Sequence, residues 1–168
     1  SQIQKFHRGV RGQNPDNRSE YLMGIAVKKI RSQREMVVAA KWFAKQKPLP
    51  AIRTVPGDLQ AGASHYLARC AVCHGEKGEG KLDTASPSLT KLEGWYFLDQ
   101  MRKFRNGQRG RHGLDPGGQA MAAAISDLTP RQIIDLVAYV VDAFGPAEAP
   151  TLRQRYLRPV ADSNASRE

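Results

Sequence analysis

Cys70-Ala71-Val72-Cys73-His74 is the stretch that decides the fold of this 168-residue chain. Two thiols separated by two residues lie on one helical turn, where each can add to a vinyl group of a haem. The imidazole that follows them then lies under the iron as an axial ligand. The sequence holds no other cysteine, so no third thiol competes for this pair. The motif therefore predicts one covalently attached c-type haem.

Three other interpretations of the cysteine pair are weaker. A thioredoxin-like redox pair requires a βαβ pattern around it, and the sequence shows none. A zinc knuckle requires a second Cys/His pair at metal-ligand spacing, whereas the nearby His65 and His112 are not paired. A chance match in a chain with two cysteines is the third alternative. The chemistry of the motif and its sequence context favour haem.

The composition is that of a soluble globular protein, with 40% hydrophobic and 25% charged residues. No apolar run approaches the length that spans a bilayer. The chain begins with Ser1 and shows no leader peptide, so we expect a processed or trimmed polypeptide. Covalent haem attachment implies maturation outside the cytoplasm. We therefore expect a periplasmic or periplasm-facing, membrane-associated location.

The positive charge is concentrated in the first third of the chain. Residues 1–57 hold twelve Lys/Arg and three Asp/Glu, a net charge of +9, whereas residues 58–168 hold fourteen and thirteen, a net charge of +1. A basic patch of this kind steers docking to acidic redox partners, and it also suits anionic lipid or nucleic acid. A solvated face is the plainest alternative. Nucleic acid rests on charge alone, so no nucleic-acid partner is predicted.

Apolar residues recur at helical spacing in four segments that Gly/Pro-rich loops separate. Asp58 suits the N-cap of the second segment. Gly62, Tyr66 and Cys70 recur every four residues along it, and Gly75 ends it. The predicted helices cover about residues 25–45, 59–74, 94–105 and 130–144, with loops over 1–23 and 106–119, an extended linker over 48–57 and a polar tail from 146 to 168.

The chain repeats itself at an offset of 98 residues, without gaps. The Phe-x-x-Gly-x-Arg-Gly pattern that begins at Phe6 recurs at Phe104, and Met23 aligns with Met121. The apolar stripe of the first predicted helix also aligns with that of the last. A repeat of this kind indicates a duplicated structural unit. The position equivalent to Cys70 falls before the first residue of the sequence.

The residues around the motif resemble class I cytochromes c. The stretch from Tyr66 through Cys70-Ala-Val-Cys-His-Gly-Glu-Lys-Gly-Glu-Gly80 carries the general resemblance. The resemblance is narrowed by the continuation, Pro87-Ser-Leu89, Trp95-Tyr96, Gln100, Phe104-Arg-Asn-Gly107-Gln-Arg109-Gly110 and then Met121. The pattern is similar to the tandem dihaem cytochrome c4 group and to the cytochrome c modules of terminal-oxidase subunits.

The resemblance implies an all-α class I cytochrome c fold around one covalent haem, preceded by half a cytochrome module. In such a fold the first and last helices cross, which places Gly62 and Tyr66 near Leu136 and Tyr139. The implied parts are an incomplete half module without a haem motif (1–47), a linker (48–57), a cytochrome c domain (58–145) and a polar tail (146–168).

The resemblance also implies roles for individual residues. His74 and Met121 become the axial iron ligands, and the Pro87 carbonyl accepts a hydrogen bond from the His74 ring, which fixes its tautomer. Arg109 contacts a haem propionate or anchors its loop. The implied haem-binding residues are Cys70, Cys73, His74, Pro87, Arg109 and Met121.

Met121 has a rival in Met101, but Met101 lies mid-helix on an apolar face, as a core side chain does. Met121 follows a Gly-rich loop, and the repeat places Met23 at the equivalent position. His112 is an outside candidate for a sixth ligand or a propionate contact. We therefore expect Met121 to be the distal ligand.

Electron transfer in a respiratory chain is the predicted function, because His/Met ligation leaves no open site on the iron. The chain is thus expected to be an electron carrier rather than an enzyme. A second hypothesis is a cytochrome subunit or fragment of a larger oxidoreductase or terminal-oxidase complex, with residues 1–47 as an interaction segment. A third is a haem without Met ligation that binds peroxide or small gases. No other catalytic motif is present.

Overall fold

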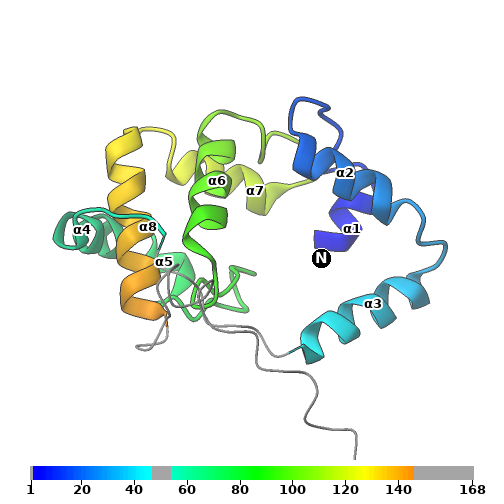
Figure 1. The fold of residues 1–168 in the computed structure, drawn as a ribbon, viewed down its shortest axis with the longest axis horizontal. Coiled ribbons are helices and arrows are strands. Elements are labelled where there is room, and N and C mark those ends of the chain that lie inside the picture. The colour runs from blue at the N-terminus through cyan, green and yellow to red at the C-terminus, as the bar shows by residue number, and fades with distance from the viewer. Residues whose placement is uncertain (1, 47–53, 146–168) are drawn as a thin grey trace, which may run out of the picture. The chain divides into compact units, whose positions relative to one another are not determined.

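The computed structural model describes residues 2–46 and 54–145. Within these ranges the chain is helical and forms no β-strand, apart from an isolated bridge between Lys81 and Ser86. The predicted all-α class is therefore confirmed (Figure 1). The helices are α1 (Gln2–His7), α2 (Arg18–Val27), α3 (Gln33–Lys45), α4 (Leu59–Arg69), α5 (Ala71–His74), α6 (Gly94–Arg105), α7 (Pro116–Ala124) and α8 (Pro130–Phe144).

Two of the predicted helices, α6 and α8, begin and end where the sequence pattern places them. The start of α4 is also as predicted, because the Asp58 side chain accepts the backbone N–H groups of Gln60 at 2.9 Å and Ala61 at 3.0 Å. An N-cap carboxylate of this kind satisfies donors that have no partner inside the helix. Local capping chemistry therefore fixes the start of α4.

The prediction of one helix over residues 25–45 is wrong, because the structure has α2 and α3 there. Ser32 begins α3: its hydroxyl accepts the Glu35 N–H at 3.2 Å, and the Glu35 carboxylate accepts the Arg31 N–H at 2.8 Å. This Ser-x-x-Glu arrangement is a capping-box signal. Read from the sequence, it would have predicted the break.

Three further differences concern short elements. α1 and the first part of α2 lie in the predicted loop over residues 1–23, and α7 begins inside the predicted loop over 106–119. The predicted helix over 59–74 is interrupted at Cys70, where α4 ends and the single turn of α5 follows. Gly75 ends that turn as expected, with a φ of +83° that favours glycine.

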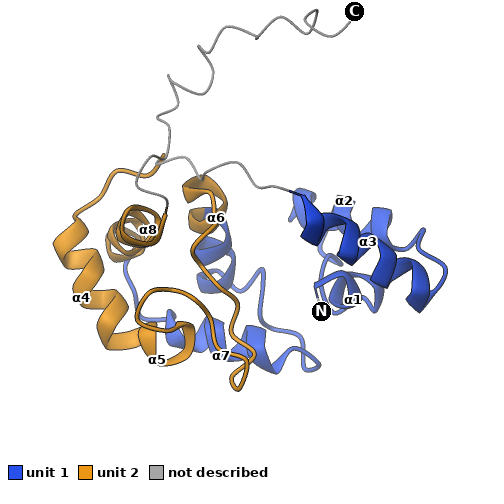
Figure 2. Ribbon diagram, turned by 90° about the horizontal axis from the view of Figure 1, so that it is seen from below, with its two compact units in different colours: residues 1–49, 99–129 blue, residues 50–98, 130–168 orange. Residues whose placement is uncertain are grey.

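The chain divides into two compact units that interleave along the sequence (Figure 2). Unit 1 consists of residues 1–49 and 99–129, and unit 2 consists of residues 50–98 and 130–168. The boundary between them falls within α6. The linear division into half module, linker, cytochrome domain and tail stays a prediction, and the linker before residue 54 and the tail lie outside the described residues.

Unit 2 is built on the crossing of α4 and α8, the predicted first and last helices of the cytochrome domain. The two backbones meet at Gly62, where a Cβ atom would collide with the carbonyl group of Asp135 and with Tyr139. The Asp135 carboxylate accepts the Asp58 N–H at 2.8 Å, which attaches the start of α4 to α8. The crossing predicted for Gly62 is therefore confirmed.

Tyr66 fills the space beneath this crossing and is fully buried. Its ring lies 5.8 Å from that of Tyr139 and 4.9 Å from that of Phe144, measured between ring centroids. Its hydroxyl donates a hydrogen bond of 2.5 Å to the carbonyl of Gly75. Burial raises the pKa of Tyr66 to about 12, with the neighbouring Cys70 adding to the shift. The phenol is therefore a neutral donor at physiological pH.

Unit 1 shows that the sequence repeat is also a structural repeat. Gly9 and Gly107 have φ angles of +71° and +68°, and Gly12 and Gly110 both have +80°. L-residues with a Cβ rarely adopt such angles. The two loops therefore have the same backbone course, and the glycines of the repeated pattern are there to permit it.

The arginines of the two loops repeat in the same way. The Arg11 guanidinium lies over the Phe6 ring at 4.8 Å, and that of Arg109 lies over the Phe104 ring at 4.4 Å. Each arginine also donates its backbone N–H over 3.1 Å to the carbonyl of the lysine six residues earlier. The repeat therefore preserves contacts as well as residue types.

Candidate haem centre

The two cysteines of the motif lie where α4 passes into α5. Backbone N–H groups of Cys73 and His74 donate to the carbonyl of Cys70 at 3.1 and 2.8 Å, which keeps the three side chains on one turn. Both thiols are free of disulfides, Cys70 buried and Cys73 exposed. Burial raises the pKa of Cys70 to about 11. Before a haem is attached, this side chain is therefore a neutral thiol at physiological pH.

His74 is buried, and its ring orientation is fixed by one hydrogen bond. Its Nδ1 lies 2.9 Å from the carbonyl oxygen of Pro87. A carbonyl only accepts, so Nδ1 carries the proton and Nε2 keeps its lone pair. This is the tautomer that a metal-ligating imidazole needs. The donor set of the motif therefore fits a haem iron.

An isolated β-bridge in the loop after the motif brings Pro87 back to the histidine. Lys81 and Ser86 exchange backbone hydrogen bonds of 3.1 and 2.9 Å. Gly80 donates its N–H to the His74 carbonyl at 2.8 Å and has a φ of +82°. These backbone bonds tie the first part of the loop to the motif, which the sequence alone did not reveal.

The described residues offer no alternative metal centre. No group of three or more His, Cys, Asp and Glu side chains comes together within 2–46 and 54–145. His65 is half-buried on α4, and His112 lies exposed in a loop, where its Nδ1 accepts the Leu114 N–H at 3.1 Å. The zinc-knuckle alternative therefore finds no ligand set in the described part of the chain.

The methionines differ in their surroundings. Met101 on α6 is 1% exposed, as expected for a core side chain, whereas Met121 on α7 is half-buried. Met23, its equivalent in the first repeat, is exposed on α2. The sequence pattern predicted that Met121 directly follows a loop, but the structure places it within α7. The backbone of Met121 is therefore part of a regular helix.

Arg109 takes part in a polar network inside unit 1. Its Nη1 donates to Gln100 Oε1 at 2.6 Å, and Arg11 Nη2 donates to the same oxygen at 2.8 Å. Arg11 also donates to Glu20 at 2.6 Å and to Gln2 at 2.8 Å. The two repeated arginines thus share one buried acceptor.

Asp115 is the buried N-cap of α7. Its Oδ1 accepts the Gly118 N–H at 2.9 Å and a charge-assisted hydrogen bond from Lys5 Nζ at 2.6 Å. Burial alone would raise the pKa of Asp115. The hydrogen bonds from Lys5 and Gly118, with the charges of Lys5 and Arg109, outweigh burial and lower that pKa below its ordinary value of 3.8.

A pH-dependent loss of stability follows. A carboxyl group whose folded-state pKa is lowered stabilises the fold above its ordinary pKa, and this contribution disappears as the pH falls through the folded value. We expect Asp115→Asn to lower the free energy of unfolding at pH 7, and the difference from the wild type to shrink below about pH 4. Denaturant titrations at a series of pH values test this. A difference that does not depend on pH would contradict it.

The residues predicted from the sequence do not include Lys5, Glu20 or Asp115, and Gln100 appears among them only as part of the family resemblance. A signal for some of them was present, because Gln2 aligns with Gln100, Lys5 with Lys103 and Asn17 with Asp115 at the same offset of 98. Polar positions that a repeat preserves point to shared contacts.

Comparison with known proteins identifies the family. The family model described as cytochrome c matches residues 59–143, half of the chain. The chain belongs to the cytochrome c family. It therefore carries a covalent haem c, attached through the Cys-x-x-Cys-His motif, and the predicted class I cytochrome c is confirmed. Members of this family are electron carriers that deliver electrons to redox partners.

Two curated relatives are similar to this cytochrome. Cytochrome c6 of Limnospira maxima is 33% identical over 88 residues, which are 51% of this chain and 93% of the relative. The cbb3-type cytochrome c oxidase subunit FixP of Bradyrhizobium sp. (strain ORS 278) is 24% identical over 132 residues, 79% of this chain. The chain spans only 43% of the length of FixP.

A solved structure shares the fold. The cytochrome c4 of Acidithiobacillus ferrooxidans has a TM-score of 0.61 and 19% identity, covering 83% of this chain and 79% of its own. This match confirms the cytochrome fold predicted from the motif. In the part of the chain that the structure describes, no helix is both long and apolar enough to span a membrane.

Proposed function

We propose that this cytochrome passes single electrons in a respiratory chain through a His/Met-ligated haem c. The observation that carries the proposal is the 2.9 Å contact between His74 Nδ1 and the Pro87 carbonyl, because it leaves Nε2 ready to bind iron. Cys70 and Cys73 supply the thioether links. With methionine as the second ligand, the iron has no open coordination site, so electron transfer is favoured over ligand chemistry.

Met121 is proposed as the distal ligand, and two observations support it over Met101. Met101 is 1% exposed within α6, so its side chain is already committed to packing. Met121 is half-buried on a helix with a strongly held N-cap. Arg109, which stacks on Phe104, is proposed to contact a haem propionate or to anchor its loop.

Ligand variants test the site. We expect Met121→Ala to abolish the weak long-wavelength absorbance band of the oxidised protein that marks Met–iron ligation. Met101→Ala, the matched control, should keep the band and lose about 2–5 kcal/mol of stability as a core truncation. A band that survives in Met121→Ala contradicts the assignment.

Cys70→Ala with Cys73→Ala should release the haem under denaturing conditions, as read from the intact mass.

The basic N-terminal segment is proposed to recognise partners with acidic docking surfaces. The lysines and arginines at positions 18, 28, 29, 31, 34, 41 and 45 are exposed on or beside α2 and α3. Charges of one sign on a surface raise the rate of encounter with an oppositely charged partner, and salt weakens the effect. We propose a periplasmic or periplasm-facing site of action, where c-type haem is attached.

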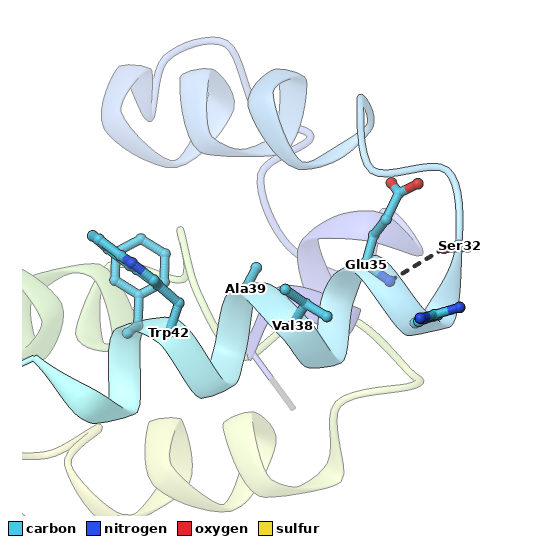
Figure 3. A pocket seen from close by; sticks show the side chains of 7 residues that line it. Ser32, Glu35, Val38, Ala39 and Trp42 are labelled. Atoms are coloured by element: carbon cyan, nitrogen blue, oxygen red, sulfur yellow. Dashed lines mark hydrogen bonds between the residues drawn. The ribbon is translucent and has the colours of Figure 1, made fainter.

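A second candidate function is that of a cytochrome subunit in a larger oxidoreductase complex, and the exposed face of α3 favours it. By the repeat α3 is equivalent to α8, and α8 buries its apolar stripe in unit 2. In α3 the corresponding Val38, Trp42 and Phe43 are 60%, 58% and 64% exposed. They border a hollow of about 620 Å³ that runs from Ser32 to Phe43 (Figure 3).

Exposed apolar side chains that gather on one face of a helix, as Val38, Trp42 and Phe43 do, mark interaction sites. We propose residues 1–47 as the interaction segment of such a subunit. The native mass decides between the two functions. A mass equal to one 18.6 kDa chain with its haem would contradict the subunit hypothesis.

A further inference from the structure

We propose that Lys5 of the first repeat is a positioning residue for Met121 and acts through Asp115, the N-cap of α7. The proposal rests on the proposed role of Met121 as the distal iron ligand. It assigns residues 1–27 a task in the haem centre of the second repeat, although they contain no haem motif of their own.

The contacts form one short path. Lys5 Nζ lies 2.6 Å from Asp115 Oδ1, and the same oxygen accepts the Gly118 N–H at 2.9 Å. The Asp115 side chain is 5% exposed and that of Lys5 27% exposed, so water screens the pair only in part. The Asp115 carbonyl also accepts the Gln119 N–H at 2.9 Å. Met121 follows two residues later on the same helix.

The repeat provides an internal comparison. Asn17 is the equivalent N-cap of α2, the helix that carries Met23, but its side chain accepts no capping hydrogen bond. Lys103, the equivalent of Lys5, donates to the Ser19 hydroxyl at 3.0 Å and pairs with Asp99 of its own helix at 2.7 Å, rather than with the N-cap of α2. Of the two equivalent helices α2 and α7, α7 has the charged cap, and it belongs to the repeat that contains the Cys-x-x-Cys-His motif.

The effect of the ion pair on α7 follows from its position. A carboxylate at a helix N-terminus is favourable because it accepts unpaired N–H groups and interacts with the helix dipole. Lys5 holds that carboxylate ionised and in place despite its burial. Without Lys5, Asp115 is a buried charge that has lost its partner, and such a group moves toward water or takes up a proton. Either change loosens the first turn of α7, and with it the backbone that carries Met121.

The experiment measures how firmly methionine holds the iron. Added imidazole competes with the methionine for the haem iron, so its apparent affinity rises when the Met–iron bond weakens. In Lys5→Met we expect imidazole to bind about tenfold more tightly than in the wild type, since a charge-assisted hydrogen bond of this kind is worth a factor of that size. Lys5→Arg should restore most of the wild-type affinity. Faster hydrogen exchange at the Gly118 amide is the expected readout that does not depend on the haem.

Controls separate this role from general stability. Arg8→Met removes an exposed basic side chain three residues from Lys5 and should leave imidazole affinity unchanged. Asp115→Asn should reproduce the effect of Lys5→Met, and the double variant should add nothing to it, so the test stands even if one variant fails to fold. A Lys5→Met protein that melts earlier but binds imidazole like the wild type would overturn the proposal. If Met121→Ala itself keeps the methionine band, the proposed ligand is wrong, whatever Lys5 does.

Discussion

Glu20→Ala is expected to lower the free energy of unfolding by about 3–5 kcal/mol, because it removes the buried carboxylate that pairs with the Arg11 guanidinium. The Glu20 carboxylate lies 2.6 Å from Arg11 Nη2, and the two side chains are 5% and 7% exposed. Arg11 also donates to Gln100, which holds Arg109 as well. The loss should therefore extend to the loop of the second repeat.

A double variant distinguishes the stability lost when one partner of the Arg11–Glu20 ion pair is removed from the net stability that the intact pair contributes. Arg11→Met with Glu20→Leu removes both charges and fills similar space, and such replacements are often neutral. It should be clearly more stable than Glu20→Ala alone. Glu76→Ala, an exposed carboxylate, should change stability by less than about 0.5 kcal/mol. Denaturant unfolding measures all three, and a Glu20→Ala loss no larger than that of Glu76→Ala would contradict the expectation.

Gly62→Ala is expected to cost about 3 kcal/mol, because the new methyl group has no room between α4 and α8. An added Cβ meets the backbone carbonyl of Asp135, which cannot move aside as the end of a flexible side chain could. The helices must separate, and the buried ring of Tyr66 then loses part of its packing. Since α4 leads directly to the cysteine motif, we also expect a lower yield of haem-loaded protein.

Gly117→Ala is the matched control, since Gly117 is also a helical glycine but has open space where its Cβ would lie. Replacing a helical glycine by alanine normally stabilises by up to about 1 kcal/mol. Opposite signs for the two substitutions in thermal or denaturant unfolding would show that close approach, rather than helix propensity, governs Gly62. Equal effects would contradict this account.

The sequence by itself determined the cofactor, the helical class and the duplication. Cys70, Cys73 and His74 are adjacent in the chain, so their chemistry needs only a local turn. The apolar stripe of α8 and the cap at Asp58 are equally local. The Gly-x-Arg-Gly loops could be matched because glycines at positive φ leave a fixed spacing in the sequence.

Only the tertiary structure decided how the two repeats cooperate. Lys5 and Asp115 are 110 residues apart in the sequence, and Arg11 and Gln100 are 89 residues apart. No local sequence signal predicts contacts over such separations. The capping box at Ser32 is visible in the sequence. The exposure of Trp42 is not, because the periodicity of α3 predicts that its apolar face is buried. Periodicity specifies which side of a helix is apolar. Contacts between distant segments decide which partner covers that side and which charges meet across the fold.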